Sequence, residues 1–355
     1  MNITELLAFA YKNGASDLHL SAGLPPLIRV DGDLRRVKME PLDKKKVMAL
    51  ISDIMTDRQR AEFEKNMDVD FSFEVKKLAR FRVNVFQQDR GPAAVFRTIP
   101  STILSLEDLK LPPIFGDLCK VNKGLILVTG PTGSGKSTTL AAMVNRVNQT
   151  RYDHILTIED PIEFVHQSNK SLVNQREIHR DSLSFANALR AALREDPDVV
   201  LVGELRDLET IRLALSAAET GHIVFGTLHT VSAAKTVDRI VDVFPGDEQP
   251  MIRSMLSESL QAVISQTLIK KQGGGRVAAQ EIMVCDSAIR NLIRENKIPQ
   301  IYSSLQTGSD KGMQTLDMHL EQLVAEGAIT MQQAYEYAKN KADFDDGTMG
   351  VQDGD

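Results

Sequence analysis

The sequence has few cysteines and no long apolar run, and these absences exclude several classes of protein. Cys119 and Cys285 are the only two cysteines in 355 residues, and they lie far apart in no metal-binding spacing. A disulfide-stapled domain is therefore excluded, whereas a reducing cytoplasm fits. No apolar run approaches the roughly 20 residues needed to span a bilayer. The start, MNITELLAFAYKNGASD, lacks the basic segment and continuous apolar stretch of a signal peptide.

The sequence also lacks an excess of basic residues. It contains 48 Asp and Glu against 42 Lys and Arg, for a net charge of -6. Proteins that bind nucleic acid through charge need a basic surface, so we expect no nucleic-acid partner. A content of 42% hydrophobic and 25% charged residues is ordinary for a folded globular chain.

The pattern along the chain predicts a two-domain α/β protein with a helical C-terminal region. Ile3, Leu6, Leu7 and Ala10 follow helical spacing, and the Asp31-Gly32 pair marks a hairpin between strand-like runs. The predicted parts are an N-terminal α/β domain (1–100), a linker that can act as a hinge (101–122), an α/β core (123–270), a mainly helical region (271–343) and a disordered acidic tail (344–355).

Short apolar runs alternate with helical stretches in the predicted core. The four runs are GLILVTG, HILTIED, DVVLVGE and HIVFGTLH. Unbroken apolar runs between helices indicate buried parallel strands in an α/β sheet. After residue 270, KKQGGGR predicts a loose turn.

The stretch GPTGSGKS fits the phosphate-loop pattern G-x-x-x-x-G-K-[ST], between a predicted strand and a predicted helix. Such a loop binds phosphate through backbone N–H groups and the helix N-terminus. We expect Lys136 to reach the β- and γ-phosphates and Ser137 to ligate Mg²⁺. The predicted nucleotide-binding residues of this segment are Gly130, Pro131, Thr132, Gly133, Ser134, Gly135, Lys136, Ser137 and Thr138.

Carboxylates follow two of the predicted strands. Glu159, Asp160 and Glu163 lie in TIEDPIEF, and Glu204 ends the run DVVLVGE. Ligands of such sheets gather at the carboxyl ends of the strands, so these side chains predict a metal or water site. A capped, solvated turn would also account for the acidic cluster.

Gly203 stands where many phosphate-loop proteins have the Asp that holds the magnesium shell. Ser137 must then hold Mg²⁺ with help from the acidic cluster, and Glu163 is the first choice for that help. Glu204 is the best candidate for a general base that activates water. Glu163 competes with Glu204 for this role, and the sequence does not separate them.

Two histidines and two arginines are further candidates. His222 and His229 flank a predicted strand, and their gap of seven residues is not a metal-ligand spacing. Beside the phosphate loop they would sense the γ-phosphate, although packed or surface histidines would look the same. Arg82 or Arg97 would reach a nucleotide as a charge-stabilising finger, and a solvated sheet face is the alternative.

Taken together, these motifs resemble one family closely. GPTGSGKST, TIEDPIE, GELRD and HIVFGTLHT occur in the order found in the secretion and type IV pilus ATPases, a family of hexameric P-loop motors. The resemblance runs from SDLHLSAGLPP at residue 16 to MQTLDM at 313–318. AIRNLI, at 288–293, is similar to a motif of the retraction branch. The absence of a four-cysteine insertion separates the chain from the assembly branch.

The resemblance implies a fold and a set of site residues. The N-terminal domain would be PAS-like and the core RecA-like, with ATP held between them in each subunit of a ring of six. Glu204 matches the Walker B glutamate and Glu163 the acidic-box glutamate. His222 and His229 match the histidine box. The family places nucleotide-contacting arginines in the segment that contains Arg82 and Arg97, and Gly203 is normal in it.

The function implied by the resemblance is a Mg²⁺-dependent ATPase motor that powers type IV pilus retraction and twitching motility. It would lie in the cytoplasm, at the cytoplasmic face of the inner membrane. Its partners would be five further copies, the inner-membrane pilus platform protein and a paralogous retraction ATPase. The alternatives are a pilus assembly or type II secretion ATPase, and a nucleotide-gated docking module with little turnover.

Overall fold

The structure, a computed structural model, describes residues 2–30, 32–76, 78–99 and 102–345. The chain divides into two compact units, one containing Met1–Ile103 and Pro161–Val165, the other Leu104–Asp160 and His166–Asp355. The boundary after Ile103 falls inside the range predicted as a linker. The predicted tail lies outside the described residues from 346 onward. None of the helices within the described ranges is long and apolar enough to cross a membrane.

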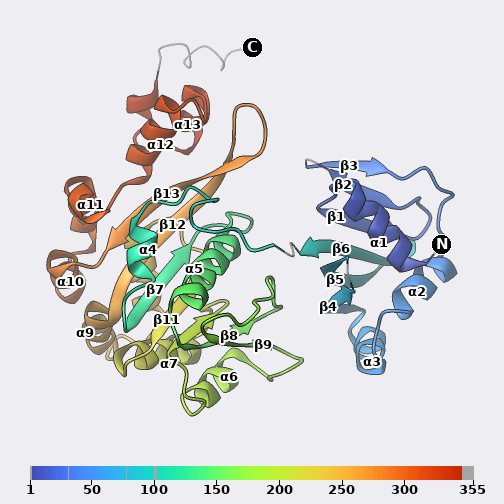
Figure 1. Cartoon of the computed structure of the whole chain (residues 1–355), viewed down its shortest axis with the longest axis horizontal. Helices are drawn as coiled ribbons and strands as arrows, with labels where there is room; N and C mark the ends of the chain where they lie inside the picture. The colour runs from blue at the N-terminus through green and yellow to red at the C-terminus, as the bar shows by residue number, and fades with distance from the viewer. Residues whose placement is uncertain (1, 31, 77, 100–101, 346–355) are drawn as a thin grey trace. The chain divides into compact units, whose positions relative to one another are not determined.

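The first unit is a six-stranded sheet with helices packed on one face (Figure 1). The strand order is β3-β2-β1-β6-β5-β4, and every pairing in it is antiparallel. Its elements are α1 (Ile3–Lys12), β1 (Asp17–Ser21), β2 (Leu27–Val30), β3 (Asp33–Arg36), α2 (Lys44–Ser52), α3 (Asp57–Asn66), β4 (Asp68–Val75), β5 (Ala79–Gln88) and β6 (Gly91–Ile99).

Alternation along the strands decides which face of this sheet is covered. Phe81, Val83 and Val85 on β5 are fully buried against the helices, whereas the residues between them are only partly buried. The predicted N-terminal helix is confirmed as α1, whose four spaced apolar residues are all buried. A capping box between Asn2 and Glu5 fixes where α1 begins.

The second unit contains a seven-stranded sheet of order β13-β12-β7-β11-β10-β8-β9. Its strands are parallel except for the β12–β13 hairpin. The strands are β7 (Gly124–Thr129), β8 (His154–Glu159), β9 (Leu172–Glu177), β10 (Val199–Val202), β11 (Ile223–Leu228), β12 (Leu260–Lys270) and β13 (Arg276–Val284). The helices are α4 (Ile114–Leu118), α5 (Lys136–Thr150), α6 (Phe185–Ala192), α7 (Leu208–Glu219), α8 (Ala233–Asp242), α9 (Gln249–Ser259), α10 (Ser287–Arg294), α11 (Ile301–Thr307), α12 (Leu316–Ala325) and α13 (Met331–Tyr337).

Helices cover both faces of this sheet, as expected for a largely parallel sheet. On β7, Ile126 and Val128 point into the core shared with α4 and α5. Leu125 and Leu127 point into the opposite core, which helices α6 to α11 complete. All six residues of β7 are buried, so this strand carries the phosphate loop from the centre of the unit.

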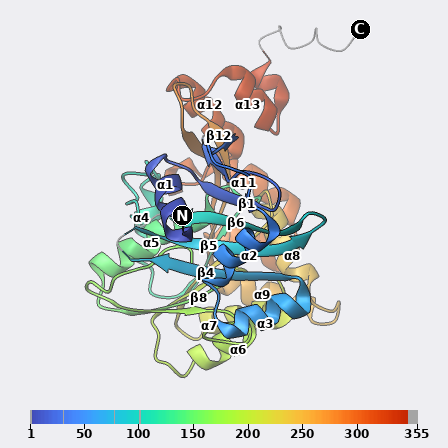
Figure 2. The same ribbon diagram turned by 90° about the vertical axis from the view of Figure 1, so that its right-hand side faces the viewer.

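A smaller core closes the C-terminal end. Helices α12 and α13 lie beside the hairpin end of β12 and β13 in both views (Figures 1 and 2). Phe344, in the short helix Lys341–Phe344, is 1% exposed within this core. The residue predicted to begin a disordered tail is therefore part of a packed cluster, because its ring is covered by apolar side chains of the last helices.

Three strands depart from the pattern expected from the sequence. The region after residue 270 was predicted to be mainly helical, but it also contains β13, which pairs with β12 across the KKQGGGR turn. Buried Ser265, Gln266 and Gln280 interrupt the apolar runs of this hairpin. The sequence pattern did not predict the edge strand β9. Its residues are mostly exposed or half-buried, and many of them are polar.

The buried position of Phe344 leads to a stability prediction. Replacing Phe344 with Ala removes a fully buried ring and should lower the free energy of unfolding by about 3–5 kcal/mol. Tyr337→Ala is the matched control, because Tyr337 is 41% exposed in the same region. Thermal unfolding of the two variants makes the comparison. Equal midpoints for both would contradict a packed C-terminal core.

Candidate active site

The carboxyl ends of neighbouring parallel strands bring the predicted catalytic residues to one edge of the second unit's sheet. In register, Thr129 of β7 pairs with Leu228 of β11, and Val202 of β10 pairs with Ile158 of β8. The phosphate loop and His229 directly follow β7 and β11, and Glu204 comes two residues after the end of β10. Glu159 is the last residue of β8, and Asp160 follows it. The carboxyl ends of neighbouring parallel strands point to the same edge of the sheet, so separation in the sequence does not separate these groups.

The phosphate loop has the backbone that an anion site requires. Gly130 has φ 142°, and a Cβ there would lie 2.1 Å from the carbonyl oxygen of Gln266, so only glycine fits. Gly135 is left-handed and caps α5 without a side-chain hydrogen bond. The buried Oγ of Ser134 has no hydrogen-bond partner among the described residues. The helix N-terminus therefore offers backbone N–H groups to phosphate oxygens.

Lys136 places a cation at the mouth of this loop. Its Nζ donates to the carbonyl oxygens of Gly130 and Pro131, at 2.9 and 3.0 Å. The positive charge also acts on Glu204, whose pKa it helps to lower. The loop and the predicted base therefore share one electrostatic environment.

Glu204 is held between two basic side chains. Its Oε1 lies 2.5 Å from Nε of Arg206 and 3.1 Å from Nε2 of His229, and its side chain is 19% exposed. Burial alone would raise the pKa of Glu204, but the hydrogen bond and charge of Arg206 outweigh it, with smaller effects from His229 and Lys136. The resulting pKa is below the ordinary value, so the carboxylate stays ionised and can accept a proton from water.

The backbone around Gly203 is closely packed. A Cβ at Gly203 would lie 3.2 Å from the carbonyl oxygen of Ile158 and 3.3 Å from Cα of Glu159. The end of β10 therefore packs directly on the backbone of β8. Thr227 Oγ1 donates to the carbonyl oxygen of Gly203 at 2.5 Å and fixes this strand end from the other side. A side chain at this position would be in tight contact with the backbone of β8.

The acidic cluster is divided between the two units. Glu159 Oε1 accepts hydrogen bonds from Thr157 Oγ1 at 2.6 Å and Gln175 Nε2 at 3.2 Å. Asp160 is exposed, and its charge raises the pKa of Arg206 after the larger effect of Glu204. Glu163 groups with the first unit. Its predicted roles beside Ser137 stay predictions.

The residues described by the structure contain no cluster of three or more His, Cys, Asp or Glu side chains placed to hold a metal ion. Mg²⁺ commonly uses one or two protein ligands and completes its shell with water and substrate phosphates. The hydroxyl of Ser137 at the start of α5 and the carboxylates at this edge fit such a sparse site.

The two histidines lie at opposite ends of β11. His229 follows the carboxyl end and contacts Glu204. His222 precedes the amino end, where its carbonyl oxygen accepts from the N–H of Gly124, the first residue of β7, at 3.0 Å. Six strand residues, about 20 Å, separate His222 from the loop edge. The second unit therefore does not bring His222 to the phosphate loop as the sequence predicted, because a strand carries its two flanks to opposite edges.

Arg82 and Arg97 lie directly opposite each other on β5 and β6 of the first unit. Nε of Arg97 donates to Oδ1 of Asp17 at 2.9 Å, and Arg97 keeps 65% of its side chain exposed. Arg82 lies 3.7 Å from Oδ2 of Asp70 with 38% of its side chain exposed. Both guanidinium groups are thus accessible on the sheet face away from the helices, and their contact with a nucleotide stays a prediction.

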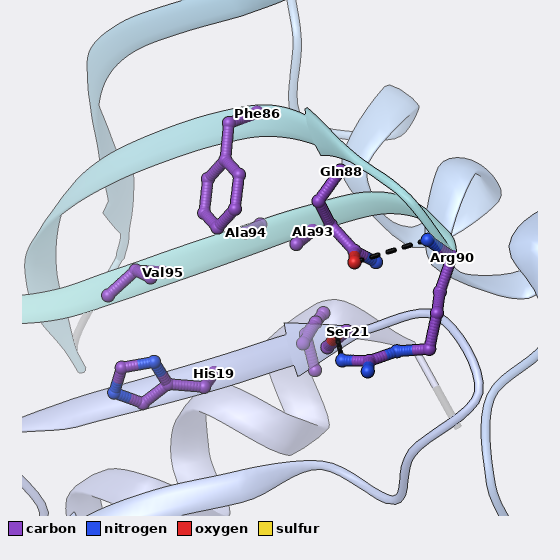
Figure 3. A pocket seen from close by; sticks show the side chains of 9 residues that line it. His19, Ser21, Phe86, Gln88, Arg90, Ala93, Ala94 and Val95 are labelled. Carbon is purple, nitrogen blue, oxygen red and sulfur yellow. Dashed lines mark hydrogen bonds between the residues drawn. The ribbon is translucent and has the colours of Figure 1, made fainter.

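A pocket of about 240 Å³ lies farther along the same sheet face (Figure 3). The rings of His19 and Phe86 and the side chains of Gln88 and Arg90 line it, from β1, β5 and the turn after β5. Nε2 of His19 and Nε2 of Gln88 have no hydrogen-bond partner among the described residues. Burial is the largest effect on His19 and lowers its pKa, so the imidazole is neutral near pH 7.

Sequence reasoning missed two residues near the loop. Arg206 lies in the GELRD motif, two residues after Glu204. This spacing could have indicated that Arg206 lies close to the Glu204 carboxylate. Gln266 lies on a strand that was not predicted, and no motif marked it. Its contacts with the phosphate loop depend on the pairing of β12 with β7.

The chain is similar to proteins of one family. The family described as Type II/IV secretion system protein matches residues 1–354. The chain is 68% identical over 344 residues to the type IV pilus retraction ATPase PilT of Pseudomonas aeruginosa, covering 97% of this chain and 100% of that protein. It is 37% identical over 345 residues to the type IV pilus ATPase PilU of the same species, covering 97% and 90%. A crystal structure of the pilus retraction motor PilT with bound ADP matches with a TM-score of 0.90 and 50% identity, over 97% of this chain and 98% of that chain.

The charges around Glu204 lead to a prediction about pH. Arg206→Ala removes the largest effect that lowers the pKa of Glu204, so this pKa should rise. The acid limb of the pH profile of ATP turnover should therefore move to higher pH. Arg206→Lys is the control, because it keeps the positive charge and should move the limb less. An Arg206→Ala enzyme whose acid limb coincides with the wild-type one would contradict this coupling.

Proposed function

The chain belongs to the family of type II/IV secretion system proteins, and from this premise we propose that it is an ATP-hydrolysing motor that powers type IV pilus retraction. The observation that carries the proposal is the single sheet edge at which the phosphate loop, Lys136 and the ionised Glu204 meet. The greater identity to PilT than to PilU of one species favours retraction itself over the role of a second pilus ATPase.

In the proposed reaction, Lys136 and the backbone N–H groups of the loop hold the β- and γ-phosphates of ATP. The hydroxyl of Ser137 helps to hold Mg²⁺, which neutralises charge on the phosphates when bound. Glu204 orients the attacking water and accepts its proton. Arg206 and His229 keep the Glu204 carboxylate ionised and aimed, because both contact Oε1.

Three further groups take part in the proposal. Arg82 and Arg97 approach the phosphates as charge-stabilising fingers, which their exposed guanidinium groups permit. Glu163 completes the metal shell or replaces Glu204 as the base. We assign no nucleotide contact to His222, because β11 carries it to the opposite sheet edge from the loop.

The proposed motor works as a ring of six copies at the cytoplasmic face of the inner membrane. Its partners are the pilus platform protein and a paralogous retraction ATPase, and the segment around residues 101–122 is the hinge. ATP turnover would change how each N-terminal unit meets the core and transmit force around the ring.

The proposed function predicts the phenotype of cells that lack the gene. Such cells should carry abundant surface pili and show no twitching motility, because pili extend but do not retract. A plasmid copy of the wild-type gene should restore motility. A Lys136→Ala copy should not, because the loop loses the cation that binds phosphate.

Counting pili by electron microscopy and measuring surface motility test both arms. Cells without pili would show that the protein extends pili and would overturn the retraction assignment. Restored motility from the Lys136→Ala copy would overturn the assignment of the ATP site.

A further inference from the structure

A buried glutamine joins the phosphate loop to the next strand of the sheet. Gln266 on β12 is 3% exposed, and it follows Ser265, which pairs with Thr129 at the end of β7. The hydroxyls of Thr129 and Ser265 lie 2.8 Å apart and are buried, which fixes this register. Gln266 is thus placed beside Gly130, at the point where β7 becomes the phosphate loop.

Gln266 contacts both ends of the loop, through its carboxamide and its backbone oxygen. Its Nε2 donates to the carbonyl oxygen of Ser134 at 2.8 Å, and its Oε1 accepts from Thr139 Oγ1 on the first turn of α5 at 3.0 Å. Its backbone oxygen lies against Gly130, where a Cβ would come within 2.1 Å. One residue therefore contacts the start of the loop, its last turn and the helix that follows.

The orientation of this carboxamide is determined by its surroundings. Oε1 also lies 3.4 Å from Nε2 of Gln280 on β13, so donors surround the oxygen. The Ser134 carbonyl can only accept, so the NH₂ group must face it. A flipped amide would place two oxygen acceptors together in a buried site, which is strongly unfavourable.

The C-terminal region supports Gln280 in turn. The N–H of Gln280 donates to Nδ1 of buried His319 on α12 at 3.0 Å. Nε2 of Gln314 donates to the carbonyl oxygen of Gln280 at 3.0 Å. Burial is the largest effect on His319 and lowers its pKa, so the ring is neutral and Nδ1 can accept. A chain of buried hydrogen bonds therefore runs from α12 through two strands to the phosphate loop.

We propose that Gln266 is a positioning residue for nucleotide binding, which holds the phosphate loop in the shape that accepts phosphate. It touches no substrate atom and acts through the Ser134 carbonyl and the start of α5. Loops that are ordered before binding lose less entropy on binding, so removal of this support weakens nucleotide affinity. The proposal rests on the proposed function for its kinetic readout, but not for its binding readout.

The test compares two glutamines on the same strand. Gln266→Met keeps the length of the side chain and removes all three of its hydrogen bonds, to Ser134, Thr139 and Gln280. Gln261→Met is the matched control, because Nε2 of Gln261 donates to the carbonyl oxygen of Lys123 at 3.0 Å, before the opposite end of β7. Gln266→Glu is the second variant, in which a carboxylate oxygen faces the Ser134 carbonyl and the Thr139 contact is kept.

We expect the Kd for ADP and the KM for ATP to rise roughly tenfold in Gln266→Met and Gln266→Glu, about the effect of one buried hydrogen bond. The kcat should change much less, because the lost support acts on bound substrate and transition state alike. Gln261→Met should keep wild-type constants. Titration of a fluorescent ADP analogue and steady-state ATP turnover supply the values.

Two results would overturn the proposal. One is wild-type nucleotide affinity in a folded Gln266→Met or Gln266→Glu protein. The other is an equal loss in Gln261→Met, which would show general loosening of β12. If Gln266→Met fails to fold, Gln266→Glu carries the test, since it keeps the volume and the accepting oxygen. A wild-type protein that binds ADP but has no ATP turnover would refute the proposed function and leave the affinity comparison intact.

Discussion

The site depends on the common end of the parallel strands β7, β11, β10 and β8. The carboxyl ends of these strands lie at the same edge of the sheet, so a helix N-terminus, a lysine, a histidine and a glutamate from distant parts of the sequence meet there. The same geometry also keeps residues at the amino ends of these strands away from the site. A residue at the amino end of β11, such as His222, lies a full strand length away from the loop.

Charge balance then sets the state of Glu204. A half-buried carboxylate in this position would resist ionisation, yet the pKa of Glu204 is lowered because Arg206, His229 and Lys136 surround it. One residue earlier, Gly203 packs closely on the backbone of β8, where any side chain would be in tight contact. We therefore propose that Glu204 supplies the acid–base chemistry at this strand end, and that Ser137 and carboxylates beyond the strand would hold the metal ion.

The sequence predicted what local patterns control. The phosphate loop, its flanking strand and helix, the four core strands and the family were all evident from short motifs. The β12–β13 hairpin was not, because its buried glutamines look like surface residues until their partners are known. Gln266 escaped notice for the same reason, since its contacts join residues whose proximity comes from strand pairing. Arg206 differs, because it contacts Glu204 only two residues away and its place in GELRD was a local signal. The place of Glu163 in the first unit likewise follows from tertiary contacts.

The most direct test of this account is a paired measurement of ATP binding and ATP hydrolysis in Glu204→Gln. The substitution keeps the shape of the side chain and removes the carboxylate that accepts the proton. The account predicts that nucleotide binding by the loop and Lys136 persists, while turnover falls by about 10²–10⁴-fold. Hydrolysis near the wild-type rate would contradict the assignment of Glu204 as the base and transfer that role to Glu163.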